Sequence, residues 1–267
     1  MLSSQWLKWN GDWYFLNPSG VMHTGWLKDN GKWYYLSSRG IMQTGWVKPD
    51  SYWYYLDSNG VMQTGWRKLN GSWYYFESNG KMKTGVFYQN QREYCFKSTG
   101  EMYYTRIFGI HQCQKKYNWC WAACAAMVGP YNINFHVTQE DIVAKYGGKF
   151  EWGTLESTIN AVNYASNYTK KAFACKKVEY NTLINYIDNN KPFILNIFPK
   201  DGGLGHMVVC SGYSTLGKLV HITDPAQAFE IDPATSGVPC FFNYDALFNS
   251  GIILNNTTYV WKETIVY

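Results

Sequence analysis

The sequence predicts two different domains: a β-hairpin solenoid of about five 20-residue repeats over residues 1–108, and an α+β domain over residues 109–267. Three observations lead to this prediction. A chain of 267 residues exceeds the usual size of one folding unit. Nine of the thirteen Trp lie before residue 74. A regular repeat runs through the first part of the chain and is lost near residue 109.

The first domain has a period of 20 residues. Two Trp, one Gly and one Met recur in it. They are Trp6, Trp26, Trp46 and Trp66; Trp13, Trp33, Trp53 and Trp73; Gly20, Gly40, Gly60, Gly80 and Gly100; and Met22, Met42, Met62, Met82 and Met102. One such unit has too little core to fold alone, so we expect neighbouring units to stack and share their apolar faces.

Each unit is predicted to be a short hairpin. In GWLKDNGKWYYL, Asn30-Gly31 separates two aromatic strands, and Asn-Gly favours a tight turn with positive φ. The same dipeptide recurs at Asn10-Gly11 and Asn70-Gly71. Strand alternation places Trp33 and Tyr35 on one face and Tyr34 on the other, so one face can form core while the other meets a ligand.

The aromatic residues could be purely structural, or they could form ligand sites. Several aromatic faces around one pocket attract a quaternary ammonium by cation–π interaction, which contributes roughly 0.5–2 kcal/mol per contact and needs no hydrogen bond. A sugar ring can stack on the same faces. The regular array favours a binding role, and choline has the chemistry that suits it.

The segments TGWLKDNGKWYYLSSRGIMQTGW and TGWRKLNGSWYYFESNGKMKTG resemble the choline-binding repeats of Gram-positive surface proteins, across residues 1–108. The resemblance implies sites shared by consecutive hairpins, which would bind choline on teichoic acid or a similar wall polymer. The implied groups are Trp6 and Trp13 with Tyr35, Trp26 and Trp33 with Tyr55, and Trp46 and Trp53 with Tyr75, together with Met42, Met62 and Met82. Val86, Glu93 and Cys95 replace aromatic residues in the fifth unit, which puts a fourth site in doubt. Related repeats of glucan-binding enzymes and toxins bind carbohydrate, which stays the alternative ligand.

In the second domain, QCQKKYNWCWAACAAMVGPY predicts a loop followed by a buried helix. Asn118 can cap this helix and Gly129-Pro130 can end it. Cys120 would then lie in the first helical turn, where unpaired amide groups and the helix dipole favour a thiolate. A Cys in an apolar helix is more often buried and inert, as we expect for Cys124.

Two later segments supply partners for Cys120. DGGLGHMVVCSGY places His206 at the edge of an apolar strand, and KLVHITDP ends in Asp224. A Cys nucleophile needs a base within hydrogen-bond reach, and the imidazole works best when a third polar group orients it. Each residue alone has a structural explanation, since Asp before Pro is commonly a turn residue. Together they predict a catalytic triad.

The order Cys, His, Asp, with a Gln six residues before the Cys, resembles papain-like cysteine peptidases over about residues 109–250. NWCWAA, GHMVV and ITDP are most similar to the compact bacterial branch. The resemblance implies a papain-like α+β fold with Cys120 as nucleophile, His206 as base and Asp224 as its orienting group. It implies Gln114 as the side-chain donor of the oxyanion hole, with Gln112 the weaker candidate. The CGSC-type signature of lysosomal relatives is absent, so their substrate preferences do not carry over.

Further elements complete the α+β prediction. Thr138 followed by Glu140 and Asp141 marks a helix start, and TLESTINAVNYAS and NTLINYIDNN predict two more helices. PFILNIF, over residues 192–198, predicts an apolar strand. Helices that precede an antiparallel sheet would place the thiol and the imidazole across a cleft between helix and sheet.

Charge and cysteine content limit the partners. The net charge is +5, but residues 1–108 hold 12 Lys and Arg against 7 Asp and Glu, and no dense basic run indicates a nucleic-acid partner. The spacing of Cys95, Cys113, Cys120, Cys124, Cys175, Cys210 and Cys240 fixes no disulfide, and their odd number leaves at least one thiol unpaired within the chain. His111, Cys113, Cys120 and Cys124 lack the short Cys pairs of a zinc site, so we expect neither metal nor cofactor.

No stretch approaches the roughly 20 apolar residues of a transmembrane helix, and MLSSQWLKWNG lacks the apolar core of a signal peptide, as expected of a processed or truncated form. We expect a secreted cysteine peptidase, attached non-covalently to the cell surface, that hydrolyses a peptide or protein substrate. The same triad can catalyse deamidation, transfer or cleavage of wall peptides. The competing interpretation is a binding protein with an inactive C-terminal domain.

Overall fold

The computed structural model describes residues 4–107, 110–146, 153–226, 241–254 and 257–267. The chain forms two compact units. The first comprises residues 1–87 and 95–102, and the second comprises residues 88–94 and 103–267. Residues 88–94 and 103–108, which the sequence prediction assigns to the repeat domain, therefore lie in the second unit.

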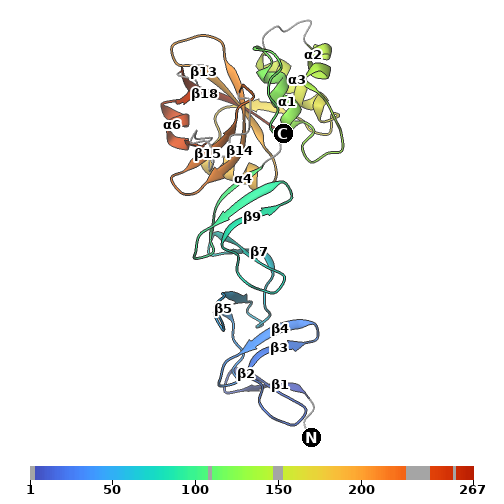
Figure 1. Cartoon of the computed structure of the whole chain (residues 1–267), viewed down its shortest axis with the longest axis vertical. Coiled ribbons are helices and arrows are strands. Elements are labelled where there is room, and N and C mark those ends of the chain that lie inside the picture. Colours follow the sequence, from blue (N-terminus) through green and yellow to red (C-terminus); the bar gives the residue numbers. More distant parts are fainter. Residues whose placement is uncertain (1–3, 108–109, 147–152, 227–240, 255–256) are drawn as a thin grey trace. The chain divides into compact units, whose positions relative to one another are not determined.

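The first unit is a series of antiparallel hairpins (Figure 1). They are β1 (Gln5–Trp9) with β2 (Asp12–Leu16), β3 (Gly25–Asp29) with β4 (Lys32–Leu36), β5 (Gly45–Val47) with β6 (Tyr54–Leu56), and β7 (Gly65–Leu69) with β8 (Ser72–Phe76). A fifth hairpin consists of β9 (Gly85–Gln89) and β10 (Arg92–Phe96), and its residues 88–94 belong to the second unit. The predicted hairpin repeats are present.

The turns explain why these strands pair. Asn30 and Gly31 have φ values of 46° and 79°, the left-handed conformation that a two-residue hairpin turn requires. The third hairpin has no Asn-Gly. There the Asp50 carboxylate accepts hydrogen bonds from the Tyr52 N–H at 2.7 Å and the Tyr54 hydroxyl at 3.0 Å, and its two strands have only three residues each.

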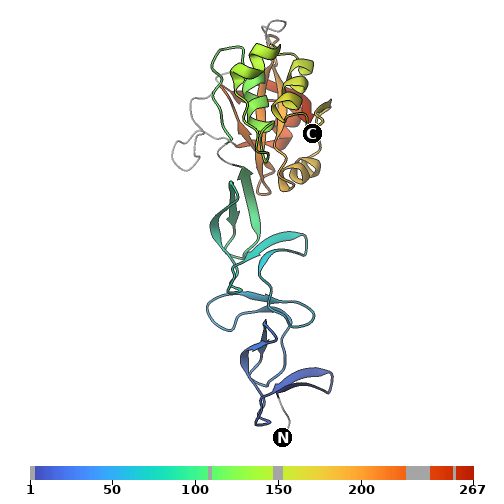
Figure 2. The same cartoon turned by 90° about the vertical axis from the view of Figure 1, so that its right-hand side faces the viewer.

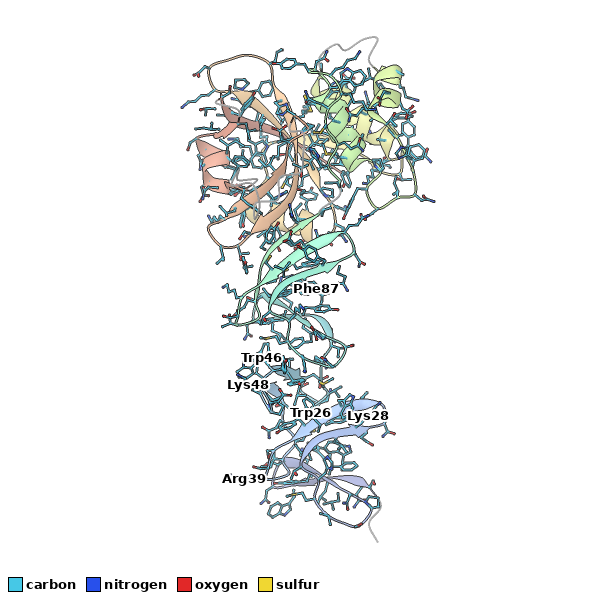
Figure 3. All side chains as sticks on the ribbon, in the orientation of Figure 1. Trp26, Lys28, Arg39, Trp46, Lys48 and Phe87 are labelled. Carbon is cyan, nitrogen blue, oxygen red and sulfur yellow. The ribbon has the colours of Figure 1, made fainter. Side chains whose placement is uncertain are left out.

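Consecutive hairpins pack through aromatic rings. Trp26 contacts Tyr54 of the next hairpin edge to face, with ring centroids 4.8 Å apart, and Trp46 contacts Tyr74 in the same way at 5.0 Å. Figure 3 labels Trp26 and Trp46 on successive hairpins. Leu56 of the third hairpin is fully buried, and Trp26 packs against the cluster to which Leu56 belongs. Stacking therefore supplies the core that one hairpin lacks.

The recurring Gly makes room for the recurring Met of the preceding period. A Cβ added at Gly60 would lie 2.5 Å from the Met42 sulfur, closer than real side-chain contacts allow. The φ of Gly60 is also +79°, a conformation that other residues adopt only at a cost. The 20-residue period of Gly and Met is therefore explained by one packing contact that is repeated along the first unit.

Gly60→Ala is expected to destabilise the first unit by about 2–4 kcal/mol, because it combines left-handed strain with overpacking against Met42. Gly45→Ala is the matched control, since Gly45 has a similar φ of +72° but no atom within 4 Å of an added Cβ. Urea unfolding followed by Trp fluorescence reports mainly on this unit, which holds nine of the thirteen Trp. Equal losses for the two variants would contradict the role of the methionine.

The second unit contains an antiparallel sheet. Its path includes the order β12-β18-β13-β14-β11, and β15 also pairs with β14. The strands are β11 (Met102–Ile107), β12 (Phe173–Cys175), β13 (Phe193–Pro199), β14 (His206–Ser214), β15 (Leu219–Thr223), β16 (Phe241–Asn243), β17 (Ile252–Leu254) and β18 (Thr257–Val266). The apolar strand predicted over residues 192–198 is β13.

Helices cover this sheet (Figures 1 and 2). They are α1 (Cys120–Val128), α2 (Gln139–Tyr146), α3 (Leu155–Ala165), α4 (Tyr180–Asp188) and α6 (Tyr244–Asn249). The three helices that the sequence predicts after Thr138 are confirmed as α2, α3 and α4. Thr138 and Asp141 exchange side-chain to backbone hydrogen bonds at the start of α2, as a capping box does.

Helix α1 lies at the centre of this unit because it is apolar on every side. Residues 121–128 are all buried, and they pack against Ile194 of β13 and Met207 and Val209 of β14. Small residues allow close approach to α3: a Cβ on Gly129 would lie 2.4 Å from the Ala165 Cβ. The packing therefore fixes the start of α1 over the sheet.

None of the helices in the described ranges is both long enough and apolar enough to cross a membrane.

Candidate functional site

The start of α1 differs from the sequence prediction. The N-cap residue is Trp119 and no side chain caps the helix, so the prediction that Asn118 does so is wrong. The cause is a turn in which the Trp119 N–H donates to the Lys116 carbonyl at 3.0 Å. Because of this turn the N-cap position falls on Trp119, one residue after Asn118. Cys120 is the first helical residue, and the N–H groups of a first turn have no partner within the helix.

The three residues of the predicted triad lie together. His206 begins β14, and Asp224 directly follows β15. The Nε2 atom of His206 lies 2.7 Å from Oδ1 of Asp224. His206 also forms a hydrogen bond with the Cys120 side chain, and Nδ1 is the ring nitrogen left for it. The imidazole thus connects thiol and carboxylate.

The charge state of His206 follows from these contacts. Burial lowers the pKa of His206, but the hydrogen bonds and charges of Asp224 and Cys120 outweigh burial and raise it to about 10. At neutral pH the imidazolium is therefore the favoured form. This cation interacts directly with the Cys120 side chain.

Backbone contacts hold Asp224 in place. The Ala226 N–H donates to Asp224 Oδ1 at 2.8 Å, and His111 Nε2 lies 3.2 Å from the Asp224 carbonyl oxygen. The Gln114 N–H donates to the Pro225 carbonyl at 2.8 Å. The loop that leads into α1 is therefore bound to the segment that carries the carboxylate. Sequence reasoning missed this contact of His111.

The two candidate glutamines lie in different places. Gln114 lines the same cavity as Cys120, and its Nε2 donates to the Tyr117 carbonyl at 2.8 Å, which leaves the second amide hydrogen for a ligand. Gln112 lines a separate cavity, and its Nε2 donates to the Ala126 carbonyl. The geometry therefore favours Gln114.

Two neighbouring groups are inert. The Cys124 thiol donates to the Met207 carbonyl at 3.2 Å, and complete burial raises the pKa of Cys124 well above its ordinary value. His221 is buried with its Nδ1 2.7 Å from the Ser211 hydroxyl, and burial lowers the pKa of His221 to about 3. Neither environment resembles that of Cys120, which lines the same cavity as His206.

The three residues of the predicted triad line a cavity of about 630 Å³. Besides Cys120, His206, Asp224 and Gln114, its lining includes the apolar residues Leu155, Phe198, Leu204, Leu254 and Tyr259. Asn196 of β13 and Glu263 of β18 also line it, and the sequence prediction missed both. The available signal was the polar Asn196 inside the apolar run PFILNIF.

Within the parts of the chain that are described, no group of three or more His, Cys, Asp or Glu could hold a metal ion. Cys240 lies outside the described residues.

The first unit holds a second cavity, of about 320 Å³. It is lined by Trp46, Trp53, Tyr74, Met82 and Thr99. Three of these are expected members of one site, but the structure brings Tyr74 rather than Tyr75 to it. Tyr75 packs instead against Trp66 of its own hairpin, at 5.3 Å. Adjacent residues of a strand face opposite sides, so only Tyr74 faces the preceding hairpin.

The earlier repeats also bring the first Tyr of each pair, rather than the second, to the Trp of the preceding hairpin. The ring centroids of Tyr34 and Tyr54 lie 4.8 Å from those of Trp6 and Trp26, respectively. Tyr35 and Tyr55 instead contact Trp26 and Trp46 of their own hairpins at 5.2 Å. The backbone N–H of each expected methionine donates to the backbone carbonyl of the second Trp of its group. These bonds run from Met42 to Trp13, from Met62 to Trp33 and from Met82 to Trp53.

Polar groups surround the aromatic cavity. The Tyr74 hydroxyl is hydrogen-bonded to Glu101, and the Thr99 hydroxyl donates to the same carboxylate. Lys48 lies over the ring of Trp53 at 5.8 Å, as Lys28 lies over Trp33 (Figure 3 labels both lysines). These lysines contribute to the basic excess of the repeats.

Comparison with protein families finds different families in the two parts of the chain. Residues 84–235, more than half of the chain, match the peptidase C39-like family. The chain belongs to this family. Residues 3–42 and 24–64 match the choline-binding repeat, and residues 64–82 match a putative cell wall binding repeat. This member of the peptidase C39-like family therefore also carries choline-binding repeats.

Several solved structures are similar to part of the chain. Choline binding protein F from Streptococcus pneumoniae is 43% identical over 38% of this chain and 35% of its own, with a TM-score of 0.36. The endolysin of phage Cp-1 complexed with choline is 33% identical over 39% and 31%, with a TM-score of 0.33. The choline binding domain of Spr1274 from Streptococcus pneumoniae is 36% identical over 30% and 95%, with a TM-score of 0.28. The chain thus spans about a third of the length of the first two. No curated protein matches the chain.

Proposed function

We propose that this protein is a secreted, papain-like cysteine peptidase that hydrolyses peptide bonds with Cys120, His206 and Asp224. Its aromatic repeats hold it non-covalently on choline-bearing wall polymer. One observation carries the enzymatic part: His206 is hydrogen-bonded to both Cys120 and Asp224 at the wall of an open cavity. A membership in the peptidase C39-like family supports the same class of reaction.

In the proposed reaction, the Cys120 thiolate attacks the carbonyl carbon of a peptide and forms a C–S bond. The His206 imidazolium gives its proton to the leaving nitrogen as the C–N bond breaks. Water then attacks the acyl-enzyme and loses a proton to His206. The C–S bond breaks, the acid product leaves, and the thiolate and imidazolium are restored. Asp224 keeps the ring oriented throughout.

The negative oxygen of the tetrahedral intermediate needs hydrogen-bond donors. Two candidates belong to residues that line the cavity: the backbone N–H of Cys120, in the uncapped first turn of α1, and the side-chain amide of Gln114. The loop that carries Gln114 is fixed by its hydrogen bond to Pro225. These donors are held in place before substrate binds, which is the condition for effective stabilisation.

Choline suits the aromatic cavity better than a sugar does. Its lining includes the aromatic rings of Trp46, Trp53 and Tyr74, whereas its only hydroxyl groups among the described residues are those of Tyr74 and Thr99. A quaternary ammonium needs ring faces and no donors, whereas a sugar needs several hydrogen bonds. The Glu101 carboxylate at Tyr74 adds negative charge beside the rings.

The first test is the rate at which iodoacetamide alkylates Cys120 between pH 5 and 9, measured by peptide mass spectrometry. At pH 6 an ordinary thiol is almost wholly protonated and reacts slowly. Because the proposed reaction uses a thiolate, Cys120 is expected to react about 100-fold faster than the exposed thiol of Cys113 in the same molecule. His206→Ala should remove this advantage, and an epoxysuccinyl inhibitor should modify Cys120 only when His206 is present.

Labelling of Cys120 as slow as that of Cys113, with no effect of His206→Ala, would contradict the peptidase and leave a binding protein. Fast labelling without peptide hydrolysis, but with release of ammonia from glutamine peptides, would favour deamidation. Circular dichroism of the His206→Ala protein provides the control for folding.

A further inference from the structure

A second charged group lies in the cavity of Cys120. Glu263 of β18 pairs directly with Asn196 of β13, and Asn196 pairs with Met207, the residue after His206. Directly paired residues share one face of a sheet. Neighbouring strands lie about 4.8 Å apart, which places Glu263 two strands and roughly 10 Å from the strand that carries His206.

Asn196 holds the Glu263 carboxylate in place. The Asn196 Nδ2 donates to Glu263 Oε2 at 2.9 Å, and Asn196 is only 5% exposed. Asn196 interrupts a strand whose residues 193–197 are otherwise apolar and buried. Burial of a polar side chain is costly unless it makes such a bond. The pair therefore presents an oriented carboxylate to the cavity.

This carboxylate has no cationic partner among the described residues. None of the ion pairs found there includes Glu263. The described cavity lining contains no Lys or Arg, and its single cation, His206, is paired with Asp224. Lys262 is exposed, and strand alternation directs it to the opposite face. A substrate that covers Glu263 without a cation would leave a desolvated, unpaired charge.

The other walls fit the stem of a long cationic side chain. Phe198, Leu254 and Tyr259 line the same cavity and offer apolar surface. Lysine and arginine bury their methylene groups against such surface while their charged ends reach a polar group. A short cation would leave these walls uncovered.

We infer that the Glu263–Asn196 pair selects peptides that carry a lysine or arginine side chain beside the bond to be cleaved. The inference rests on the proposed peptidase function and names its substrate class. In it, Asn196 is a positioning residue, and the Glu263 carboxylate binds the substrate ammonium or guanidinium directly. Hydrogen bonds to charged groups contribute enough to discriminate about tenfold or more between charged and neutral side chains.

The test uses the full chain and pairs of dipeptidyl acyloxymethyl ketones, which alkylate a catalytic thiol. The two probes of a pair differ only in carrying lysine or its neutral analogue norleucine at one position. In one pair this position is next to the reactive group, and in the other pair it is one residue further away. The second-order rate of Cys120 modification is measured by mass spectrometry. We expect the lysine probe to react at least about tenfold faster at one position in the native protein.

Glu263→Gln should abolish this preference by slowing the lysine probe about tenfold while sparing the norleucine probe. Glu156→Gln is the matched control, because Glu156 is an exposed acid in the first turn of α3 and does not line the cavity. Equal rates of the two probes with the native protein, or an unchanged preference in Glu263→Gln, would overturn the inference. In those cases, fast and His206-dependent labelling of Cys120 by iodoacetamide would still support the proposed peptidase function. Loss of that labelling would instead overturn the proposed function and, with it, the inference.

Discussion

Asp224→Asn is expected to lower the rate of peptide hydrolysis at pH 7 by up to about 10⁴-fold, the loss shown by a serine-protease triad whose Asp is replaced by Asn without a change of geometry. Asn can still accept a hydrogen bond at the position of Oδ1, where His206 and the Ala226 N–H now meet. It lacks the negative charge that favours the imidazolium. The amide can also turn its NH₂ group toward the ring and fix the wrong tautomer.

The pH profile separates this role from a structural one. Hydrolysis needs protonated His206 as the acid, so the native rate should fall as pH rises through the His206 pKa of about 10. Removing the Asp224 charge removes a cause that raises this pKa, so in Asp224→Asn the fall should occur at lower pH. Alkylation of Cys120 should not fall above pH 10, because a thiolate needs no acid to react.

Hydrolysis of fluorescein-labelled casein between pH 6 and 11 measures both effects. Asp245→Asn is the matched control, since Asp245 is an exposed acid whose ion pair with Lys218 lies outside the cavity. An alkaline limb that stays in place in Asp224→Asn would show that Asp224 does not set the charge of His206.

Trp53→Ala should weaken choline binding at the aromatic cavity by roughly 30-fold, because it removes one of three rings that surround the cation. Isothermal titration with choline should then show one site fewer per chain. Retention on an immobilised trimethylammonium matrix should fall more steeply than the affinity of one site, since linked sites act together.

Trp9→Ala is the control for this substitution. Trp9 is 62% exposed and lines none of the cavities described above, so its loss should leave the number of choline sites unchanged. A dextran competitor tests the carbohydrate alternative. Displacement by dextran but not by choline would contradict the assignment of the cavity.

Periodic features of the sequence predicted local structure well. Asn30-Gly31 predicted its turn because few residues adopt positive φ, and the 20-residue step predicted stacking hairpins. Thr138 predicted the start of α2 because the residues that cap this helix, Thr138 and Asp141, lie within four residues of each other in the chain. Cys120, His206 and Asp224 could be proposed together because the reaction itself requires a thiol, a base and an orienting group.

The errors concern contacts that sequence spacing does not encode. Tyr74 and Tyr75 are equally aromatic neighbours, and only the stacking direction of the hairpins decides which one faces Trp46. Asn118 is a good capping residue, but the turn from Lys116 to Trp119 places it outside the cap position. Glu263 follows no motif, and it reaches the cavity only through its pairing with Asn196, 67 residues earlier.

By itself, the sequence predicted the repeat unit, several helices and strands of the second unit and a candidate catalytic triad, because turn chemistry, strand alternation and helix capping act over a few residues. The tertiary structure decided which Gln, which Tyr and which acid share a cavity. Those choices depend on strand register and on the packing of α1 against β13 and β14, which bring together residues far apart in the chain.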